Sequence, residues 1–258
     1  MDKDLDFSGK TILVTGSGRN IGKAIILEFA KRGANVVINA RSNREEADGV
    51  LREAEALGAK GIVVLGDAGE KSVIDEMKAR AEEAFGRVDI YVSNAAKRLH
   101  KDFWDTTDED WHRHLNQQLT ASWYLAKAFT PAMRDAGYGR IIHINGPDGY
   151  EGGWTRVPHS TAKGGLRTLT KSLAAGLGEY GITVNDINPG YAETVRDPTT
   201  HPSLASQEQK DRIREQIPIR RGAKTEEIAF AVAFLCSPLA LPITGSIIHL
   251  DGGRNMFG

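Results

Sequence analysis

Short apolar runs rich in β-branched residues alternate with segments of helical spacing along most of the chain. The first run, Thr11–Thr15, is continuous, as expected for a strand that is covered on both faces. In the next segment, Ile21–Arg32, apolar residues recur at three- and four-residue intervals, which predicts a helix that ends at Gly33. Comparable runs predict six further strands: Asn35–Ala40, Ile62–Leu65, Asp89–Val92, Arg140–Ile144, Thr183–Ile187 and Ser246–Leu250.

Strands that alternate with helices predict an α/β fold, here a Rossmann-type, doubly wound parallel sheet of about seven strands with helices on both faces. No Pro/Gly/Ser-rich linker divides the sequence, so residues 1–258 are expected to form a single domain. Residues 191–217 interrupt the pattern with Pro198, Pro202 and a polar helix-like run. Long irregular insertions in compact domains are often functional, and this one is interpreted as a substrate lid within the domain.

Charge and composition exclude several classes of partner. The chain has 33 basic and 34 acidic residues with no basic stripe, so we expect neither nucleic acid nor an anionic membrane as a partner. No run of about 18 apolar residues is present to span a bilayer, and the first residues lack the apolar core of a signal peptide. The single cysteine, Cys236, cannot form an internal disulfide and fits a reducing compartment. We therefore expect a cytoplasmic location.

A glycine-rich turn, Thr15–Gly22, joins the first predicted strand to the first predicted helix. Such a turn presents bare backbone N–H groups and the positive end of the helix to a pyrophosphate. Because the whole strand–turn–helix–strand unit is present, the turn predicts a dinucleotide site. Its candidate cofactor-binding residues are Gly16, Ser17, Arg19, Asn20, Ile21 and Gly22.

The end of the second predicted strand indicates which cofactor is bound. NAD-binding domains place an acidic residue there to hold the ribose 2′-hydroxyl, whereas this chain has Ala40, followed by Arg41 and Ser42. Arg19 in the glycine turn would lie close by, and paired guanidinium groups could clamp a 2′-phosphate that a carboxylate would repel. The sequence therefore predicts NADP(H) rather than NADH.

These motifs, in this order, resemble the short-chain dehydrogenase/reductase family over nearly the full length. The turn resembles the family's TGxxxGxG, with Asn20 in place of the middle glycine; asparagine tolerates a left-handed backbone better than other residues with a side chain. The resemblance adds cofactor-binding candidates after the third, fourth and sixth strands: Asp67, Ala68, Asn94, Ala95, Ala96, Pro189, Gly190 and Thr194. It also implies a homotetramer or homodimer.

The family's chemistry, as the resemblance implies, uses Asn, Ser, Tyr and Lys, the last two as YxxxK on one helix face. Asn116 and Lys163 match this pattern, and Lys163 is also expected to bind the nicotinamide ribose. The tyrosine position holds His159 and the serine position holds Gly146, so two of the four groups are replaced. The predicted catalytic set is therefore His159, Lys163 and Asn116.

Three hypotheses about the chemistry of this altered centre stay open. His159 could be the acid/base of a modified reductase, since imidazole titrates near neutrality. The chain could instead reduce an activated C=C or C=N bond that needs little help from a proton donor. It could also hold NADP(H) without hydride transfer, with His159 merely the helix-entry residue after Pro158.

Loops beside the predicted centre offer substrate-contacting candidates: Gly146, Asp148, Tyr150, Trp154 and Tyr191. Lys97 and Arg98 lie near the expected substrate entrance, where they could bind a carboxylate, although base rates favour a solvated loop. The histidines form no cluster with cysteines or carboxylates at metal-ligand spacing, so no metal site is predicted.

Overall fold

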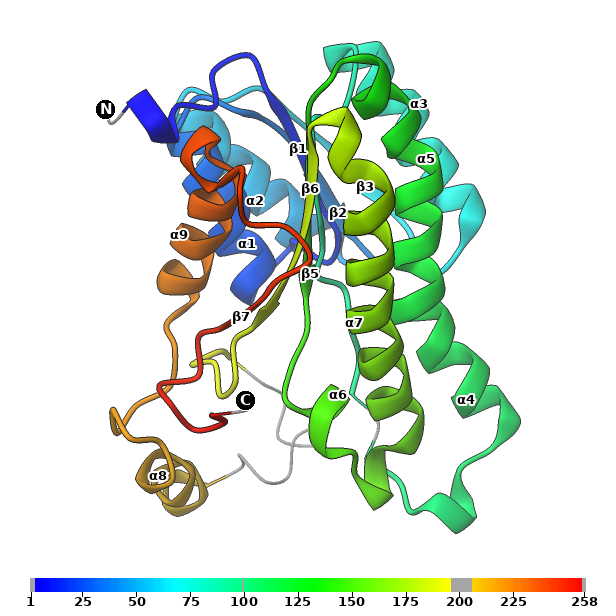
Figure 1. Ribbon diagram of the computed structural model, residues 1–258, viewed down its shortest axis with the longest axis vertical. Helices are drawn as coiled ribbons and strands as arrows, with labels where there is room; N and C mark the ends of the chain where they lie inside the picture. Colours follow the sequence, from blue (N-terminus) through cyan, green and yellow to red (C-terminus); the bar gives the residue numbers. More distant parts are fainter. Residues whose placement is uncertain (1–2, 99, 196–205, 257–258) are drawn as a thin grey trace.

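The computed structural model describes residues 3–98, 100–195 and 206–256, and within these ranges seven parallel strands form one sheet (Figure 1). The strand order is β3-β2-β1-β4-β5-β6-β7, which confirms the predicted doubly wound fold. The strands are β1 (Thr11–Val14), β2 (Asn35–Ala40), β3 (Gly61–Leu65), β4 (Ile90–Ser93), β5 (Gly139–Ile144), β6 (Ile182–Asn188) and β7 (Ile247–His249).

Helices cover both faces of the sheet (Figure 1). One face carries α1 (Asn20–Lys31), α2 (Arg44–Ala56) and α9 (Thr225–Cys236), and the other carries α3 (Lys71–Phe85), α5 (Ala121–Asp135) and α7 (Val157–Leu177). Each layer buries its own apolar core against the strands. The remaining α-helices are α4 (Asp108–Leu115), α6 (Asp148–Glu151) and α8 (Gln207–Glu215), and short 3₁₀ turns span Lys3–Leu5, Phe103–Asp105, Trp154–Arg156, Gly178–Tyr180 and Pro238–Ala240.

The strand register places the functional end of the sheet. In β1, Ile12 pairs with Val36 of β2 on one side and with Ile90 of β4 on the other. The chain therefore winds outward in both directions from β1 and β4. Parallel sheets with this reversal leave a crevice at the carboxyl ends of those two strands, which is where such folds bind ligands.

The segment Trp111–Met133, which contains Asn116, is not one regular α-helix. The segment consists of α4, one π-helical turn at Asn116–Thr120, and α5. A π-turn holds an extra residue, so every side chain within it is rotated relative to the positions that α-helical spacing predicts. This irregularity changes which polar side chains of the segment are buried.

Part of the predicted lid, residues 196–205, lies outside the described residues. The polar run that follows forms α8, whose first turn is closed by reciprocal hydrogen bonds between Ser206 and Gln209. A lid function for residues 191–217 therefore stays a prediction. Cys236 is fully buried, and none of the helices in the described ranges is both long and apolar enough to cross a membrane.

Candidate active site

A cleft of about 670 Å³ opens at the carboxyl ends of the strands, where the fold predicts one. It runs from the glycine turn at the start of α1 to the first turns of α7, so it joins the predicted dinucleotide site to the predicted catalytic helix. The sequence-predicted residues that line it are Gly16, Arg19, Asn20, Ile21, Gly22, Arg41, Ser42, Asp67, Ala68, Asn94, Ala95, Ala96, Gly146, His159, Lys163, Pro189, Gly190 and Thr194.

The glycine turn is held in an open, rigid form. Gly16 has φ +62°, and a Cβ on Gly22 would lie 2.5 Å from the carbonyl oxygen of Gly16, so α1 packs against the turn at a distance that only glycine permits. The side chain of Asn94 donates to the carbonyl oxygens of Thr15 and Gly16, at 2.9 and 3.1 Å. The turn is thus fixed without side chains filling the space above it.

Ser17 is a correction to the predicted cofactor set. Its side chain is fully buried, and its hydroxyl donates to the carbonyl oxygen of Val14 at 2.8 Å, so it secures the turn from beneath and does not line the cleft. Asn39, which the sequence analysis did not identify, does line it and accepts a hydrogen bond from the Gly16 amide at 3.2 Å. The available signal was an amide side chain within the otherwise apolar run of β2.

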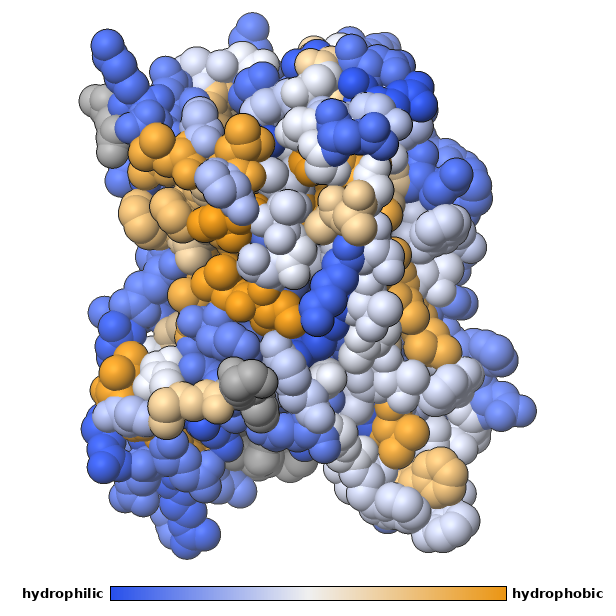
Figure 2. Space-filling model, in the orientation of Figure 1, coloured by the Kyte–Doolittle hydropathy of each residue, from blue (hydrophilic) through white to orange (hydrophobic). Residues whose placement is uncertain are grey.

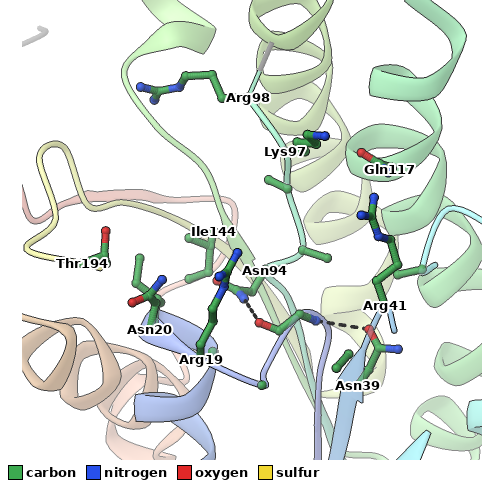
Figure 3. Close-up of a pocket in the computed structure, with 18 of the residues that line it drawn as sticks. Arg19, Asn20, Asn39, Arg41, Asn94, Lys97, Arg98, Gln117, Ile144 and Thr194 are labelled. Carbon is green, nitrogen blue, oxygen red and sulfur yellow. Dashed lines mark hydrogen bonds between the residues drawn. The ribbon is translucent and has the colours of Figure 1, made fainter. Parts of the chain in front are cut away.

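Two arginines line the cleft beside the glycine turn, at the end where the adenosine of a dinucleotide is expected. Arg19 and Arg41 are exposed, line the cleft, and form no ion pair among the described residues. Figure 3 shows Arg19 projecting from the glycine turn and Arg41 from the end of β2. Glu46 of α2 lines the same region. Two cations without protein partners are suited to a phosphate, although Glu46 reduces the local positive charge.

Asn20 bridges the cleft. Its φ of +51° confirms the left-handed backbone expected for a residue in the place of a glycine. Its amide nitrogen donates to the carbonyl oxygen of Val195 at 2.9 Å, and its oxygen accepts from the Val195 amide at 3.1 Å. This pair of bonds ties the glycine turn to the segment after β6.

His159 is held by a buried carboxylate. Its Nε2 lies 3.3 Å from Oδ2 of Asp148, which also contacts Arg98 at 2.8 Å, while Oδ1 contacts Arg156 at 3.0 Å. Burial alone would raise the pKa of Asp148, but the hydrogen bond from His159 and the two guanidinium charges hold it well below its usual range.

The imidazole of His159 is neutral at physiological pH. Burial lowers its pKa to about 4, despite the hydrogen bond to Asp148, and the charge of Lys163 acts in the same direction. A neutral ring that donates from Nε2 to a carboxylate must carry its lone pair on Nδ1. This Nδ1 is screened from water and has no hydrogen-bond partner among the described residues.

Lys163 lies one helical turn after His159 on the same face of α7, as the spacing predicts. Its Nζ donates to the carbonyl oxygen of Ile144 at 2.8 Å, which leaves two donors without a partner within the described ranges. Burial lowers the pKa of Lys163 to about 8, partly offset by the charge of Asp186. The ammonium group is therefore fixed but still able to bind a ribose hydroxyl.

The position of the family's serine is empty space. A Cβ built on Gly146 would meet no atom within 4 Å, and Arg167 donates to the Gly146 carbonyl oxygen at 2.9 Å from below. No side chain of the described residues supplies a hydroxyl at this point. Within the described ranges, this end of the cleft thus presents the imidazole of His159 and the ammonium group of Lys163.

Asn116 does not take the predicted catalytic place. It is exposed, does not line the cleft, and is the first residue of the π-turn. Gln118 is the buried amide of this turn, and its Nε2 lies 3.5 Å from the carbonyl oxygen of Lys97. Gln117 lines the cleft and donates to Asp67 at 2.8 Å. Regular helical spacing did not predict that Gln117 lines the cleft or that Gln118 is buried.

Four of the five predicted substrate residues are placed elsewhere, and only Gly146 lines the cleft. Asp148 lies behind His159 because the short helix α6 turns its carboxylate inward. The ring of Tyr150 lies against the guanidinium group of Arg167. These two residues support the site without facing its opening.

Trp154 and Tyr191 are also outside the cleft. Trp154 packs against Phe103 and Trp104 in an aromatic cluster, with ring centroids 5.1 and 5.6 Å away. Tyr191 is fixed through its carbonyl oxygen, which accepts from the Ala223 amide at 2.9 Å. Arg98, by contrast, lines the cleft and is partly buried, so the solvated-loop interpretation of this residue is wrong.

A Rossmann-type sheet with a glycine turn, a dinucleotide-sized cleft and a helix-borne lysine at its far end defines the class of NAD(P)-binding oxidoreductases. A family model described as "Enoyl-(Acyl carrier protein) reductase" matches residues 16–255. The chain belongs to the short-chain dehydrogenase/reductase family, as its motifs indicated.

Characterised relatives and solved structures agree with this assignment. The chain is 36% identical over 252 residues to the 3-oxoacyl-[acyl-carrier-protein] reductase FabG of Escherichia coli (strain K12), covering 98% of this chain and 100% of that protein. A putative gluconate dehydrogenase from Agrobacterium tumefaciens is 30% identical with a TM-score of 0.90, covering 98% and 99% of the two chains. A gluconate 5-dehydrogenase from Burkholderia cenocepacia J2315, solved in complex with NADP and tartrate, is 28% identical with a TM-score of 0.88, covering 97% of each chain.

Proposed function

We propose that this chain is an NADP(H)-dependent oxidoreductase that interconverts an alcohol and a carbonyl compound, with His159 in the place of the family's tyrosine. The observation that carries the proposal is the single cleft that joins Arg19 and Arg41 at one end to His159 and Lys163 at the other. The residues fit the cofactor: the backbone of the glycine turn lines the cleft at the start of α1, where a pyrophosphate would bind, and Lys163 has two donors for the ribose without a partner within the described ranges. Bound there, the nicotinamide ring would accept or supply a hydride.

His159 would exchange the proton. During alcohol oxidation the substrate hydroxyl would have to reach the buried Nδ1, an acceptor with no partner among the described residues. The imidazolium formed would be stabilised by Asp148, which also fixes the tautomer, in the manner of a histidine–carboxylate pair. In carbonyl reduction the same imidazolium would return its proton to the oxygen. The low pKa of His159 favours the neutral base, and hence the oxidation direction.

Absorbance at 340 nm tests hydride transfer. The protein is incubated with NADPH and ketones, enones or imines, and with NADP⁺ and the matching alcohols. We expect turnover with at least one alcohol–ketone pair and a loss of about 100-fold or more in His159→Gln, since general acid–base catalysis contributes about 10²–10⁴-fold. His112→Gln, which changes an exposed histidine of α4, is the matched control. Tight NADPH binding with no turnover would favour the alternative, a cofactor-holding protein without hydride transfer.

The double variant Gly146→Ser, His159→Tyr tests whether the scaffold is otherwise that of an ordinary reductase. The open space beside Gly146 accommodates a serine side chain, so we expect this variant to fold. Gain of ketone reduction would show that the altered chemistry resides in these two side chains. A folded, NADPH-binding double variant without activity would mean that further groups of the centre differ.

The cofactor preference is tested by the double variant Arg19→Ala, Arg41→Ala. We expect NADPH affinity to fall by about tenfold or more and NADH affinity to stay within about twofold, because the lost cations face only the 2′-phosphate. Arg44→Ala is the control, since Arg44 is equally exposed but pairs with Asp48 and does not line the cleft. Equal losses for both cofactors would refute the assignment.

A homo-oligomer is proposed from the surface of α9. This helix is apolar on all sides: Ile228, Ala229 and Val232 are buried in the core, whereas Phe230 and Phe234 are 52% and 44% exposed. Figure 2 shows hydrophobic atoms gathered over α9 and the segment leading to β7. Helices that are apolar all round are normally covered, which a second copy would do. Light scattering after size exclusion tests this, and a monomer at micromolar concentration would refute it.

A cytoplasmic location is proposed from the cysteine usage: the single cysteine, Cys236, is fully buried and cannot form an internal disulfide, which fits a reducing compartment. Fractionation of the producing cell tests it directly. Recovery in a secreted fraction would contradict it.

A further inference from the structure

Arg98 stands on the wall of the cleft beside the proposed base. Its Nη2 and the Nε2 of His159 contact the same oxygen of Asp148, at 2.8 and 3.3 Å. The guanidinium group and the imidazole are therefore separated by no more than two hydrogen-bond lengths. The other guanidinium donors of Arg98 have no partner within the described parts of the chain.

The surroundings of Arg98 carry excess positive charge. Among the described residues, four cations interact there with two carboxylates, which leaves a surplus of two positive charges when both acids are ionised. The cations are Arg98, Arg156, Lys163 and Arg167, and the acids are Asp148 and Asp186. Burial and the neighbouring charge of Arg156 lower the pKa of Arg98 although Asp148 opposes this. Buried charges without full compensation are costly, and a bound anion would offset the cost.

The phosphates of the cofactor do not supply that anion. Figure 3 shows Arg98 on the opposite side of the cleft from Arg41, away from the glycine turn that would hold the pyrophosphate. Lys97 is exposed at the same end of the cleft, so it adds positive charge and no acid. The cation at this position faces the space left for the substrate.

We propose that Arg98 binds a carboxylate of the substrate, so that the chain acts on short hydroxy acids or the corresponding oxo acids. The inference rests on the proposed function, since the hydroxyl or carbonyl is the group presented to His159. Arg98 and His159 contact the same oxygen of Asp148, so the two side chains lie close together. A substrate that contacts both must therefore be short, with its carboxylate only a few bonds from the carbon that carries the hydroxyl or carbonyl group. A planar guanidinium group is the usual partner for such a carboxylate, which it can bind through two parallel hydrogen bonds.

Malonate and dimethyl malonate, which share one carbon skeleton but carry two carboxylates and two uncharged methyl esters respectively, are titrated calorimetrically into the NADPH-loaded protein. We expect malonate to bind at millimolar concentration or better and the ester to bind at least tenfold more weakly. Arg98→Gln should weaken malonate binding by about 10- to 100-fold, as expected for a hydrogen bond to a charged group, and leave the ester unaffected. Arg98→Lys, which keeps the charge but not the paired donors, should fall between, and it provides the measurement if Arg98→Gln does not fold.

Arg156→Gln is the matched control, because Arg156 binds the same carboxylate of Asp148 but does not line the cleft. The proposal is overturned if malonate does not bind, if acid and ester bind equally, or if Arg156→Gln and Arg98→Gln weaken malonate alike. Failure of the proposed function is distinguishable. If malonate binding depends on Arg98 but no substrate changes the absorbance at 340 nm, hydride transfer alone is refuted. If acetoacetate and methyl acetoacetate are turned over equally, only the carboxylate site is refuted.

Discussion

Acidification from pH 6 to pH 4.5 is expected to destabilise the folded protein through two buried histidines. Burial lowers the pKa of His159 to about 4 and that of His143, on β5, to about 3, from an ordinary value of 6.5. Below pH 6.5 the unfolded chain binds a proton at each site that the folded chain does not. Their contribution to stability is therefore present above pH 6.5 and is lost as the pH falls toward 4.

Asp186 acts in the opposite direction. Burial raises its pKa to about 6 from an ordinary value of 3.8, partly offset by a hydrogen bond from Asn145. As the pH falls, Asp186 is therefore protonated in the folded chain before it is protonated in the unfolded chain. This difference stabilises the folded state between pH 6 and pH 4. Near pH 5 the unfolded state binds two more protons than the folded state at His143 and His159, and one fewer at Asp186. The net difference of one proton lowers the free energy of unfolding by about 1.4 kcal/mol for each pH unit of acidification, or about 2 kcal/mol between pH 6 and 4.5.

The free energy of unfolding is measured by urea denaturation at pH 4.5, 5, 5.5 and 6 for the wild type and for Asp186→Asn. Removing the compensating carboxylate leaves the two histidines alone, so the slope should double to about 2.7 kcal/mol per pH unit. Groups with lowered carboxyl pKa values, such as Asp148 and Glu227, act mainly below this window. Parallel pH slopes for the two proteins would refute the reasoning about Asp186.

Three further changes test the site. Asp148→Asn leaves two guanidinium groups without their carboxylate, and because each side chain is about a quarter exposed, we expect a loss of about 2–4 kcal/mol in the free energy of unfolding by urea denaturation. Asn20→Gly keeps the left-handed backbone but removes both bonds to Val195, so stopped-flow fluorescence should show faster NADPH release at similar stability; an unchanged release rate would contradict this. Gly22→Ala places a Cβ 2.5 Å from the Gly16 carbonyl oxygen and should weaken NADPH binding by at least tenfold in a fluorescence titration.

The fold and the cofactor end of the cleft could be predicted because their signals are local. Continuous apolar runs predict buried parallel strands, and a glycine turn between such a run and a helix leaves few alternatives for the backbone. Strand boundaries differed by at most one residue at either end, as at Thr15, which follows β1 instead of ending it. The main error at this end was Ser17, whose hydroxyl is turned inward and hydrogen-bonds to the carbonyl oxygens of Val14 in β1 and Asn39 in β2, which the motif does not predict.

The substrate end was predicted less well because its geometry depends on irregular backbone. Within the π-turn Asn116–Thr120, Asn116 is exposed and Gln118 is buried, and α-helical spacing does not predict the positions of side chains in such a turn. The short helix α6 turns Asp148 away from the cleft and toward His159. The motif thus predicts His159 at this position, whereas nothing in the sequence predicts that Asp148 contacts its ring.

The burial of two carboxylates near His159 and Lys163 bears on the choice between an enzyme and a protein that only holds the cofactor. Asp148 and Asp186 are nearly fully buried, and replacing such ionic groups with apolar ones of similar volume is often neutral or stabilising. A scaffold that only retained NADP(H) would need Lys163 and the glycine turn but would gain nothing from a carboxylate that orients His159 between two arginines. Because this carboxylate and the two arginines do not form part of the dinucleotide site, the network supports the proposed reaction at His159, which the 340 nm assay tests.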